Sequence, residues 1–314
     1  MQNMLGSGPD DGDVLEMGPD KPRRAWAIGR RSRVVLAIAC VCALLAAGGT
    51  VAGLRLSSRG PADPTLAGLI TEVTTVPMST VRSASGGEGS YAGSLPSASS
   101  SGNSASSSIT AFAGISAPTV VYGSPLTSGG KPEVLYVATE FCPYCVAESW
   151  PLIVALSRFG QFSGLRTSRS PPFEDIPPTD GWTFYGSSYT SRYLVFAPVE
   201  TYSNVLVKPR ADPGNPESYR KLQPLTAAEQ AVMSQYDKAR QTPFIDFGGT
   251  ATELGSGIEP TVLAGLTWSQ IAADLRRPAT TAGAALLFTT NTLISELCQL
   301  TDDQPAAACI EPGG

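Results

Sequence analysis

The sequence predicts a mixed α/β domain that follows one transmembrane helix, and three features of its 314 residues indicate this fold class. Residues 34–54 form a long apolar stretch without charge. Residues 134–139 have the pattern of a buried strand, and a helix that ends near Gly160 follows them directly. Residues 244–254 have the pattern of two strands joined by a tight turn at Gly248-Gly249.

Residues 34–54 are the predicted membrane span. These 21 uncharged residues would form a helix roughly 30 Å long, which matches the hydrocarbon core of a bilayer. Six basic side chains lie within 1–33, and 21–33 contain no acid, so the positive-inside rule places 1–33 in the cytoplasm as a basic tail. We therefore expect a single-pass protein of the cell membrane whose C-terminal domain is extracytoplasmic. A cleaved signal peptide, or a lipoprotein signal ending at Cys40, is the alternative.

Residues 55–111 are predicted to hold a juxtamembrane helix and a linker. Asp63-Pro64 has the composition of a helix start, and apolar residues then follow helical spacing to about 76. The amphipathic pattern suits packing on the folded domain. Residues 83–108 are dominated by Ser, Gly and Ala, which predicts a flexible tether. The folded domain is then expected over 112–314, with a C-terminal helix and tail over 281–314.

Composition excludes several classes of function. From residue 60 onward there are 14 basic and 22 acidic side chains, so nucleic acid is not an expected partner. The absence of histidine excludes Ser-His-Asp and Cys-His catalysis and most zinc sites. The six cysteines fall into the pairs 40/42, 142/145 and 298/309, of which Cys40 and Cys42 are expected to be apolar membrane residues.

The sequence Cys142-Pro143-Tyr144-Cys145, placed between a strand and a helix, predicts thiol chemistry. Pro143 suits the first helical turn, so Cys142 lies at the helix N-terminus, where free N–H groups and the helix dipole stabilise a thiolate. We expect Cys142 to be the nucleophile, with a pKa below the free value of about 8.5, and Cys145 to be the resolving thiol. No cofactor is expected. A structural disulfide between these cysteines and a half zinc site are the alternatives.

Other side chains are candidates for supporting roles. Glu140 is a candidate for proton transfer, although a carboxylate at the rim of the site is the favoured interpretation, and Glu148 is expected to be solvated. Phe141 and Tyr144 are expected to shape an apolar surface around the sulfurs. Core positions are expected for Trp150, Phe159 and Phe162.

The last two cysteines, Cys298 and Cys309, are predicted to form a structural disulfide that pins the final helix to the tail. A shuttle pair that exchanges electrons with the first pair is the alternative.

The order of elements resembles the thioredoxin superfamily. After the first helix and a strand at Leu165–Ser168 come a helix, Thr242-Pro243, a strand, a tight turn, a strand and a helix. The resemblance implies that Pro243 is cis, faces the cysteines and, with Thr242, pairs with an extended substrate segment, while Pro143 and Tyr144 also help to position it. It further implies a mixed central sheet flanked by helices, with an insertion over 170–240 before the cis-proline strand, similar to exported bacterial disulfide-exchange proteins.

Four longer stretches are similar to a narrower family. They resemble a prokaryotic thioredoxin-like family catalogued as domain of unknown function 929, from about residue 65 to the C-terminus: FCPYCVAESWPLIVALSRFGQFSGL, YTSRYLVFAPVE, TPFIDFGG and LAGLTWSQIAADL. This resemblance implies the fold and adds little about function.

These features together predict an extracytoplasmic, membrane-anchored thiol–disulfide oxidoreductase. Its expected partners are exported proteins that bear thiols or disulfides, or a redox partner in the membrane. A non-catalytic binding module with an inert cysteine pair is the second hypothesis, and metal handling through the cysteines is the third. The direction of electron flow does not follow from the sequence.

Overall fold

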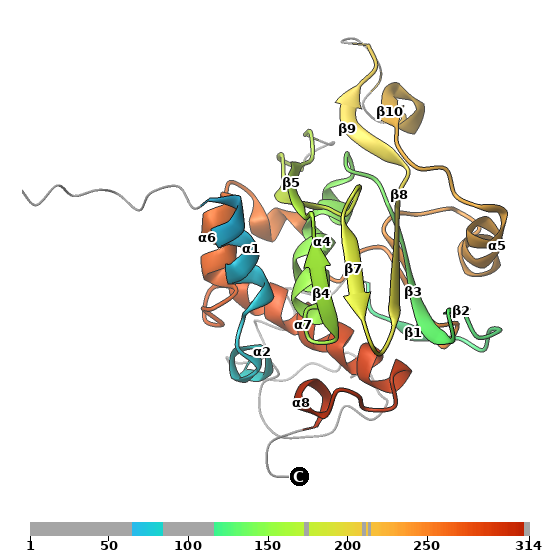
Figure 1. Ribbon diagram of the computed structural model, residues 1–314. Coiled ribbons are helices and arrows are strands. Elements are labelled where there is room, and N and C mark those ends of the chain that lie inside the picture. Colours follow the sequence, from blue (N-terminus) through green and yellow to red (C-terminus); the bar gives the residue numbers. More distant parts are fainter. Residues whose placement is uncertain (1–64, 84–115, 173–175, 209–211, 213–214, 311–314) are drawn as a thin grey trace, which may run out of the picture. The chain divides into compact units, whose positions relative to one another are not determined.

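The computed structural model of the chain describes residues 65–83, 116–172, 176–208, 212 and 215–310 (Figure 1). The basic tail 1–33, the predicted span 34–54 and the linker from 84 onward lie outside these residues. Within the described part, no helix has both the length and the apolarity that crossing a bilayer requires. The described elements confirm the mixed α/β class.

The central sheet is built around β3 (Lys131–Ala138). This strand pairs parallel with β8 (Val195–Glu200) and antiparallel with β11 (Phe244–Phe247), and β11 pairs antiparallel with β12 (Ala251–Leu254). The last five residues of β3 are all buried. The continuous apolar run in the sequence is explained by this central position, because both faces of the strand are covered. Two short strands complete the sheet, β1 (Thr119–Val120) beside β12 and β2 (Thr127–Ser128) beside β3.

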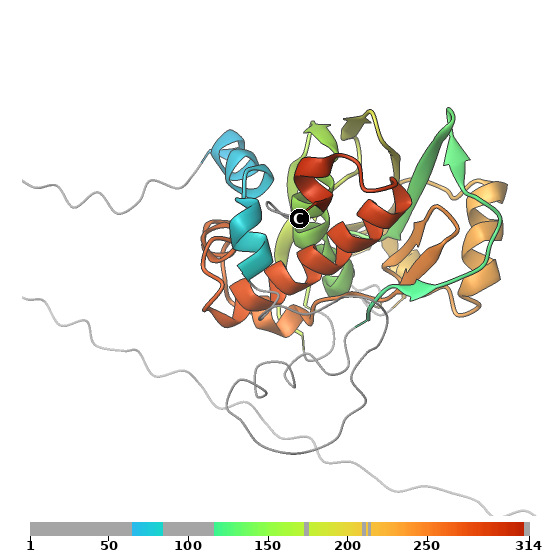
Figure 2. The same ribbon diagram turned by 90° about the horizontal axis from the view of Figure 1, so that it is seen from below.

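Helices cover both faces of this sheet. On one face, α4 (Pro143–Leu156) packs against α7 (Thr281–Leu300), and both contribute to the larger hydrophobic core (Figure 2). On the other face, Met233 of α5 (Ala227–Tyr236) packs with Val137 of β3 in a smaller core. Alternating residues of β3 therefore serve two separate cores, as the two-residue period of a strand requires.

The remaining strands form three ribbons outside the central sheet. Each ribbon contains two antiparallel strands: β4 (Gly160–Ser163) with β7 (Ser188–Ser191), β5 (Arg166–Arg169) with β6 (Asp180–Thr183), and β9 (Tyr202–Leu206) with β10 (Tyr219–Lys221). The other short elements are η1 (Pro216–Ser218), η2 (Pro260–Leu263), α6 (Trp268–Asp274) and α8 (Ala306–Cys309).

The strand predicted at Leu165–Ser168 is present as β5, but it lies in a ribbon outside the central sheet, and a strand of the central sheet lies within the predicted insertion over 170–240. Residues 166–169 form β5 in a ribbon, because Arg166 and Arg169 are exposed and cannot enter a covered sheet. The strand beside β3 is β8, whose Phe196 and Val199 are buried. A core strand thus divides the predicted insertion into a part before β8 and a part after it.

The predicted juxtamembrane helix is present and is docked on the folded domain. It forms α1 (Leu66–Thr74), and a helix that was not predicted, α2 (Met78–Ser83), follows it. α1 contacts α6 and α4, and α2 contacts α7. Four apolar side chains of this segment are buried in the larger core: Leu69, Val73, Val76 and Val81. The segment before the linker is therefore part of the same folded unit.

Replacing Leu69 with alanine should measure how much this docking contributes. Leu69 is 6% exposed, so Leu69→Ala should lower the free energy of unfolding by about 3 kcal/mol, as leucine truncations in a core do. Leu66 lies on the same helix but is 42% exposed, so Leu66→Ala should change the free energy of unfolding by less than about 0.5 kcal/mol. Urea denaturation of the two variants checks this, and equal effects would contradict the docking of α1.

Candidate active site

The cysteine pair lies at the start of α4. β3 ends at Ala138, and a short turn leads to Cys142, which is the N-cap residue, with Pro143 in the first helical turn. Cys142 is half-buried, Cys145 is 3% exposed, and both are free thiols in this structure. The sequence thus presents one accessible sulfur and one covered sulfur at the same helix terminus.

A residue far along the chain faces Cys142. The Cys142 thiol donates a hydrogen bond to the carbonyl oxygen of Thr242, with an Sγ–O distance of 3.5 Å across 100 residues of sequence. The Thr242-Pro243 bond is cis, as the resemblance implied. Pro243 is buried and immediately precedes β11, the neighbour of β3. The structure therefore brings Thr242 and Pro243 to the cysteines, as predicted.

The two thiols are electrostatically unequal. Hydrogen bonding from the Cys145 thiol, and then from the backbone N–H groups of Cys145 and Tyr144, lowers the pKa of Cys142 against the opposing effect of burial. Burial raises the pKa of Cys145 well above its ordinary value, and its hydrogen bond to Cys142 raises it further. Deprotonation therefore favours Cys142, the more exposed of the two sulfurs.

Aromatic side chains surround the pair. The ring of Phe141 stacks on that of Tyr219, with centroids 4.3 Å apart and planes at 4°. Below the helix start, the Tyr136 hydroxyl donates to the carbonyl oxygen of Cys145 at 3.1 Å. Tyr144 is half-buried between the cysteines. The predicted core positions hold for Trp150 and Phe159, which are buried, while Phe162 is partly buried against the same core.

Glu148 is buried, so the prediction that it is solvated is wrong. Its Oε2 accepts hydrogen bonds from Ser256 Oγ at 2.8 Å and from the N–H of Gly257 at 2.9 Å. Burial raises the pKa of its carboxyl group to about 7. A second buried carboxyl group, that of Glu253, has its pKa raised by burial and by the charges of Glu148 and Glu296. The sequence signal was available, because residues 146–156 are apolar apart from Glu148 and Ser149, which indicates a helix covered all round.

Glu140 belongs to a second carboxylate pair, which sequence reasoning missed. Thr183 Oγ1 lies 2.8 Å from Glu140 Oε1 and is also hydrogen-bonded to Glu200 Oε2. One hydroxyl proton serves only one of these contacts, so a proton held by Glu200 allows both to be hydrogen bonds. Burial raises the pKa of Glu200 to about 7, which is consistent with that proton. Among the described residues, the hydrogen-bond partners of the Glu140 carboxylate are Thr183 and the N–H of Asn204.

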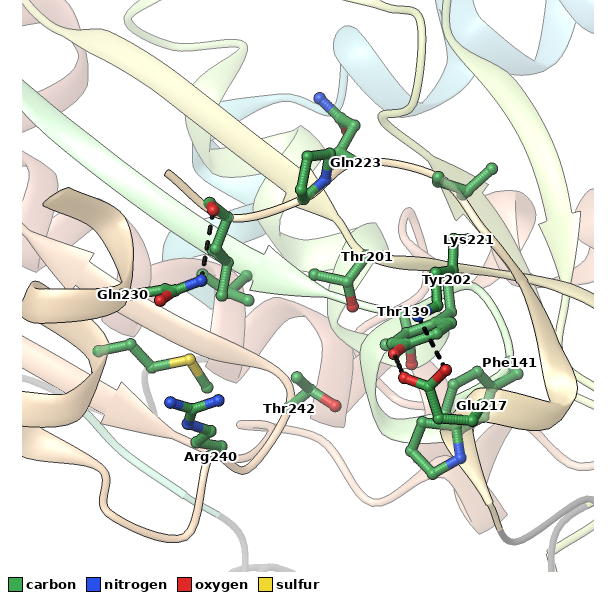
Figure 3. Close-up of a pocket in the computed structure, with 16 residues that line it drawn as sticks. Thr139, Phe141, Thr201, Tyr202, Glu217, Lys221, Gln223, Gln230, Arg240 and Thr242 are labelled. Atoms are coloured by element: carbon green, nitrogen blue, oxygen red, sulfur yellow. Dashed lines mark hydrogen bonds and ion pairs between the residues drawn. The ribbon is translucent and has the colours of Figure 1, made fainter. Parts of the chain in front are cut away.

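A pocket with a volume of about 690 Å³ is lined by Phe141, which precedes Cys142, and by Thr242, whose carbonyl contacts the Cys142 thiol (Figure 3). The end of β3, Phe141 and Thr242 form one part of its wall, and residues between β8 and β11 form the rest. Its lining comprises Val137, Thr139, Phe141, Thr201, Tyr202, Pro216, Glu217, Lys221, Leu222, Gln223, Pro224, Leu225, Gln230, Met233, Arg240 and Thr242. No periodic pattern in the sequence indicated this pocket, because most of its wall comes from irregular segments.

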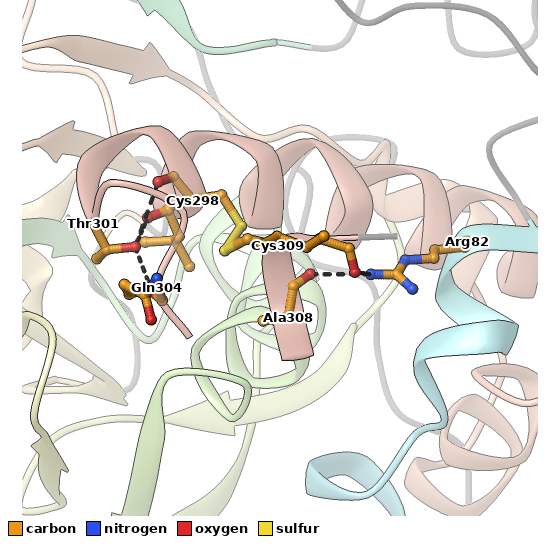
Figure 4. Close-up of a disulfide and its surroundings, with 8 residues drawn as sticks. Arg82, Cys298, Thr301, Gln304, Ala308 and Cys309 are labelled. Atoms are coloured by element: carbon orange, nitrogen blue, oxygen red, sulfur yellow. Dashed lines mark hydrogen bonds between the residues drawn. A yellow bond between two sulfur atoms is a disulfide. The ribbon is translucent and has the colours of Figure 1, made fainter. Parts of the chain in front are cut away.

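The predicted Cys298–Cys309 disulfide is present and joins α7 to α8 (Figure 4). Arg82 of α2 donates to the carbonyl oxygens of Ala308, at 3.4 Å, and Ile310, at 3.1 Å. The disulfide thus fixes the segment against which α2 is hydrogen-bonded. The predicted pairing is confirmed, and its role as a structural staple stays a prediction.

Together these features define a mixed α/β protein that presents a Cys-x-x-Cys pair at the start of a buried helix. Residues 118–211 match the family model described as Domain of unknown function (DUF929), which confirms the resemblance to that family over this part of the chain. The match includes both site cysteines and Glu140, and it ends before Thr242 and Pro243. No curated protein and no solved structure matches the chain.

The burial of Glu148 predicts a dependence of stability on pH. Its pKa is about 7 in the fold against an ordinary 4.5, so the fold favours the protonated carboxyl group. This contribution is complete below pH 4.5 and is lost as the pH rises from 4.5 to 7. Glu148→Gln should therefore reduce the loss of stability across this interval by about 3 kcal/mol, as followed by denaturant unfolding at each pH. Glu259→Gln, which changes a partly exposed carboxylate, is the control, and an equal effect there would contradict the assignment.

The disulfide predicts a separate effect on stability. Replacing Cys298 and Cys309 together with alanine opens a loop with a sequence separation of 11. The free energy of unfolding should fall by about 3 kcal/mol in the chain-entropy model. The rate of Cys142 alkylation in this double variant should equal that of the unaltered protein. Unchanged stability, together with an altered redox equilibrium of the Cys142–Cys145 pair, would instead favour the shuttle interpretation.

Proposed function

We propose that this chain is a membrane-anchored thiol–disulfide oxidoreductase that acts outside the cytoplasm. The observation that carries the proposal is the inequality of the two thiols at the start of α4. Cys142 is partly accessible, has a lowered pKa and lies 3.5 Å from the Thr242 carbonyl, whereas Cys145 is buried with a raised pKa. A nucleophile and a resolving thiol need this division of properties.

A thioredoxin-like fold is part of the proposal. The order of β3, α4 and the parallel β8, followed by α5, the antiparallel β11 and β12, and α7, supports it. The cis proline at the start of β11, beside the cysteine pair, also supports it.

In the proposed reaction, the Cys142 thiolate attacks one sulfur of a partner's disulfide. A mixed disulfide forms between Cys142 and that sulfur, and the other partner sulfur leaves as a thiolate that takes up a proton. Cys145 then loses its proton, and its thiolate attacks Cys142 Sγ and releases the second partner thiol. The Cys142–Cys145 pair becomes oxidised and the partner reduced by two electrons. The reverse sequence oxidises a partner dithiol.

Neighbouring residues take supporting roles in this reaction. Thr242 and Pro243 lie beside the attacking sulfur of Cys142 and align the partner chain, with Pro143 and Tyr144 shaping the surface around it. Glu140 is proposed to take part in proton transfer through Thr183, which it shares with Glu200. The pKa of Glu200, about 7, allows this pair to take up or release a proton near neutral pH.

The proposed location rests on the chain outside the described residues. The apolar stretch 34–54 would anchor the protein, and the partners would be exported proteins or a membrane redox partner. The Cys298–Cys309 disulfide supports this location, because disulfides persist in oxidising compartments.

Alkylation of Cys142 tests the proposal. The rate of alkylation in the reduced full-length protein should follow a pKa below about 8.5, the value of a free cysteine. In addition, Cys145→Ser should accumulate partner proteins disulfide-linked to Cys142, because attack is retained and resolution is lost.

Cys142→Ser is the matched control, which should accumulate no such species. A Cys142 pKa at or above the free value, together with no trapped partner in the Cys145→Ser variant, would favour the non-catalytic binding module.

A further inference from the structure

The pocket beside Thr242 combines an apolar wall with a cation, Arg240, and the exchange of thiols requires neither of them. We propose that it binds a segment of the partner polypeptide that places a large apolar side chain, with a carboxylate close by, next to the reacting cysteine of the partner. This inference rests on the proposed function, and it names a substrate preference for the same site.

The position of the pocket links it to Cys142, whose sulfur is the attacking atom. Val137 of β3 lies opposite Phe244 of β11, so Thr139 and Thr242 follow at the same edge of the sheet. Both line the pocket, and the Thr242 carbonyl is the group that contacts Cys142 Sγ. An extended chain advances about 3.3 Å per residue. Residues one or two places from a partner's cysteine therefore reach the pocket.

The walls suit an apolar side chain. Val137, Leu225 and Met233 come from the smaller core of the domain and line the pocket on one side. Phe141 is held in place by stacking on Tyr219. The volume of about 690 Å³ lies within the range of about 300–1,000 Å³ that is usual for ligand sites. A preformed wall of this kind binds an apolar group without first ordering side chains.

One buried polar atom of the wall is without a partner. Thr139 is 5% exposed, and its Oγ1 has no hydrogen-bond partner among the described residues. In contrast, the side-chain amides of two glutamines in the same pocket are hydrogen-bonded. Gln223 accepts from the N–H of Glu200, and Gln230 donates to the carbonyl oxygen of Leu225. A buried hydroxyl group left unpaired is unfavourable, and a peptide N–H or C=O group would satisfy it.

The charge of the pocket favours a carboxylate. Lys221 pairs with Glu217 at 2.8 Å, whereas the guanidinium group of Arg240 has no ion-pair partner among the described residues (Figure 3). Arg240 has a left-handed backbone with φ of 56°, held by the Asp237 carboxylate, which accepts from the N–H groups of Ala239 and Gln241. This unusual conformation places a cation at the pocket beside Thr242.

A set of short peptides tests the preference on the reduced, full-length protein in detergent. Each peptide carries one central cysteine in a disulfide with 5-thio-2-nitrobenzoate. Attack by Cys142 releases 5-thio-2-nitrobenzoate, which is followed by absorbance, and Cys145 then releases the peptide thiol as the Cys142–Cys145 disulfide forms. The residues on either side of the cysteine are Phe or Ser, and the residues two places from the cysteine are Asp or Asn. N-acetylcysteine carrying the same leaving group is the reference disulfide.

The second-order rate constant, relative to the reference disulfide, should be about tenfold higher for the Phe peptides than for the Ser peptides. Asp in place of Asn should add about threefold at physiological ionic strength. Arg240→Gln should abolish the difference between Asp and Asn, whereas Lys238→Gln, which removes an exposed charge two residues away, should retain it.

The outcomes separate this inference from the proposed function. Equal relative rate constants for the Phe and Ser peptides, or a reference disulfide that reacts as fast as the Phe-Asp peptide, would overturn the pocket assignment. If neither the peptides nor the reference disulfide oxidises the Cys142–Cys145 pair, the proposed function fails.

Discussion

The antiparallel register of β3 and β11 is the constraint on which the site depends. Because Val137 lies opposite Phe244, the residues that follow β3 and those that precede β11 meet at one edge of the sheet. Cys142 and Thr242 therefore face each other although 100 residues separate them. A shift of one residue would turn each side chain to the opposite face of the sheet and separate these groups. The cores on both sides of β3 hold this register, so stability and site geometry have a common origin.

The domain buries an unusual amount of acid near this edge. Glu148 and Glu200 have pKa values of about 7. The pKa of Glu253 is raised by burial and by the charge of Glu148. Placing carboxyl groups in a core is unfavourable when they are charged, so the fold keeps protons on them close to neutral pH. The charge state of the core beneath α4 therefore changes over the same pH range in which thiols begin to ionise.

The sequence was sufficient to predict the elements that have the strongest local patterns. It predicted the two strands within 244–254, which are β11 and β12, and a C-terminal helix from residue 281, where α7 begins. The pairing of Cys298 with Cys309 followed from their isolation as the last two cysteines. The strand at Leu165–Ser168 exists but lies outside the central sheet, which the sequence did not indicate, since strand pairing depends on contacts between distant segments and leaves no local trace. Polar side chains in buried positions, such as Glu148, contradict the general rule for charged residues, and only the all-apolar helix around it indicated burial.

Because α1 and α2 are docked on the domain, the Ser/Gly-rich segment that follows them starts and ends on the same folded unit. Both ends of this segment, at Ser83 and at Ser116, belong to one folded unit, since Val81 is buried in the same core as β3 and α7. The segment therefore connects two parts of a single folded unit, and the flexible tether that its composition predicts would contribute to the free energy of folding through the entropy of loop closure. That entropy changes slowly, by about 0.6 kcal/mol for each doubling of length. Insertions and deletions in such a tether are therefore expected to be nearly neutral for folding.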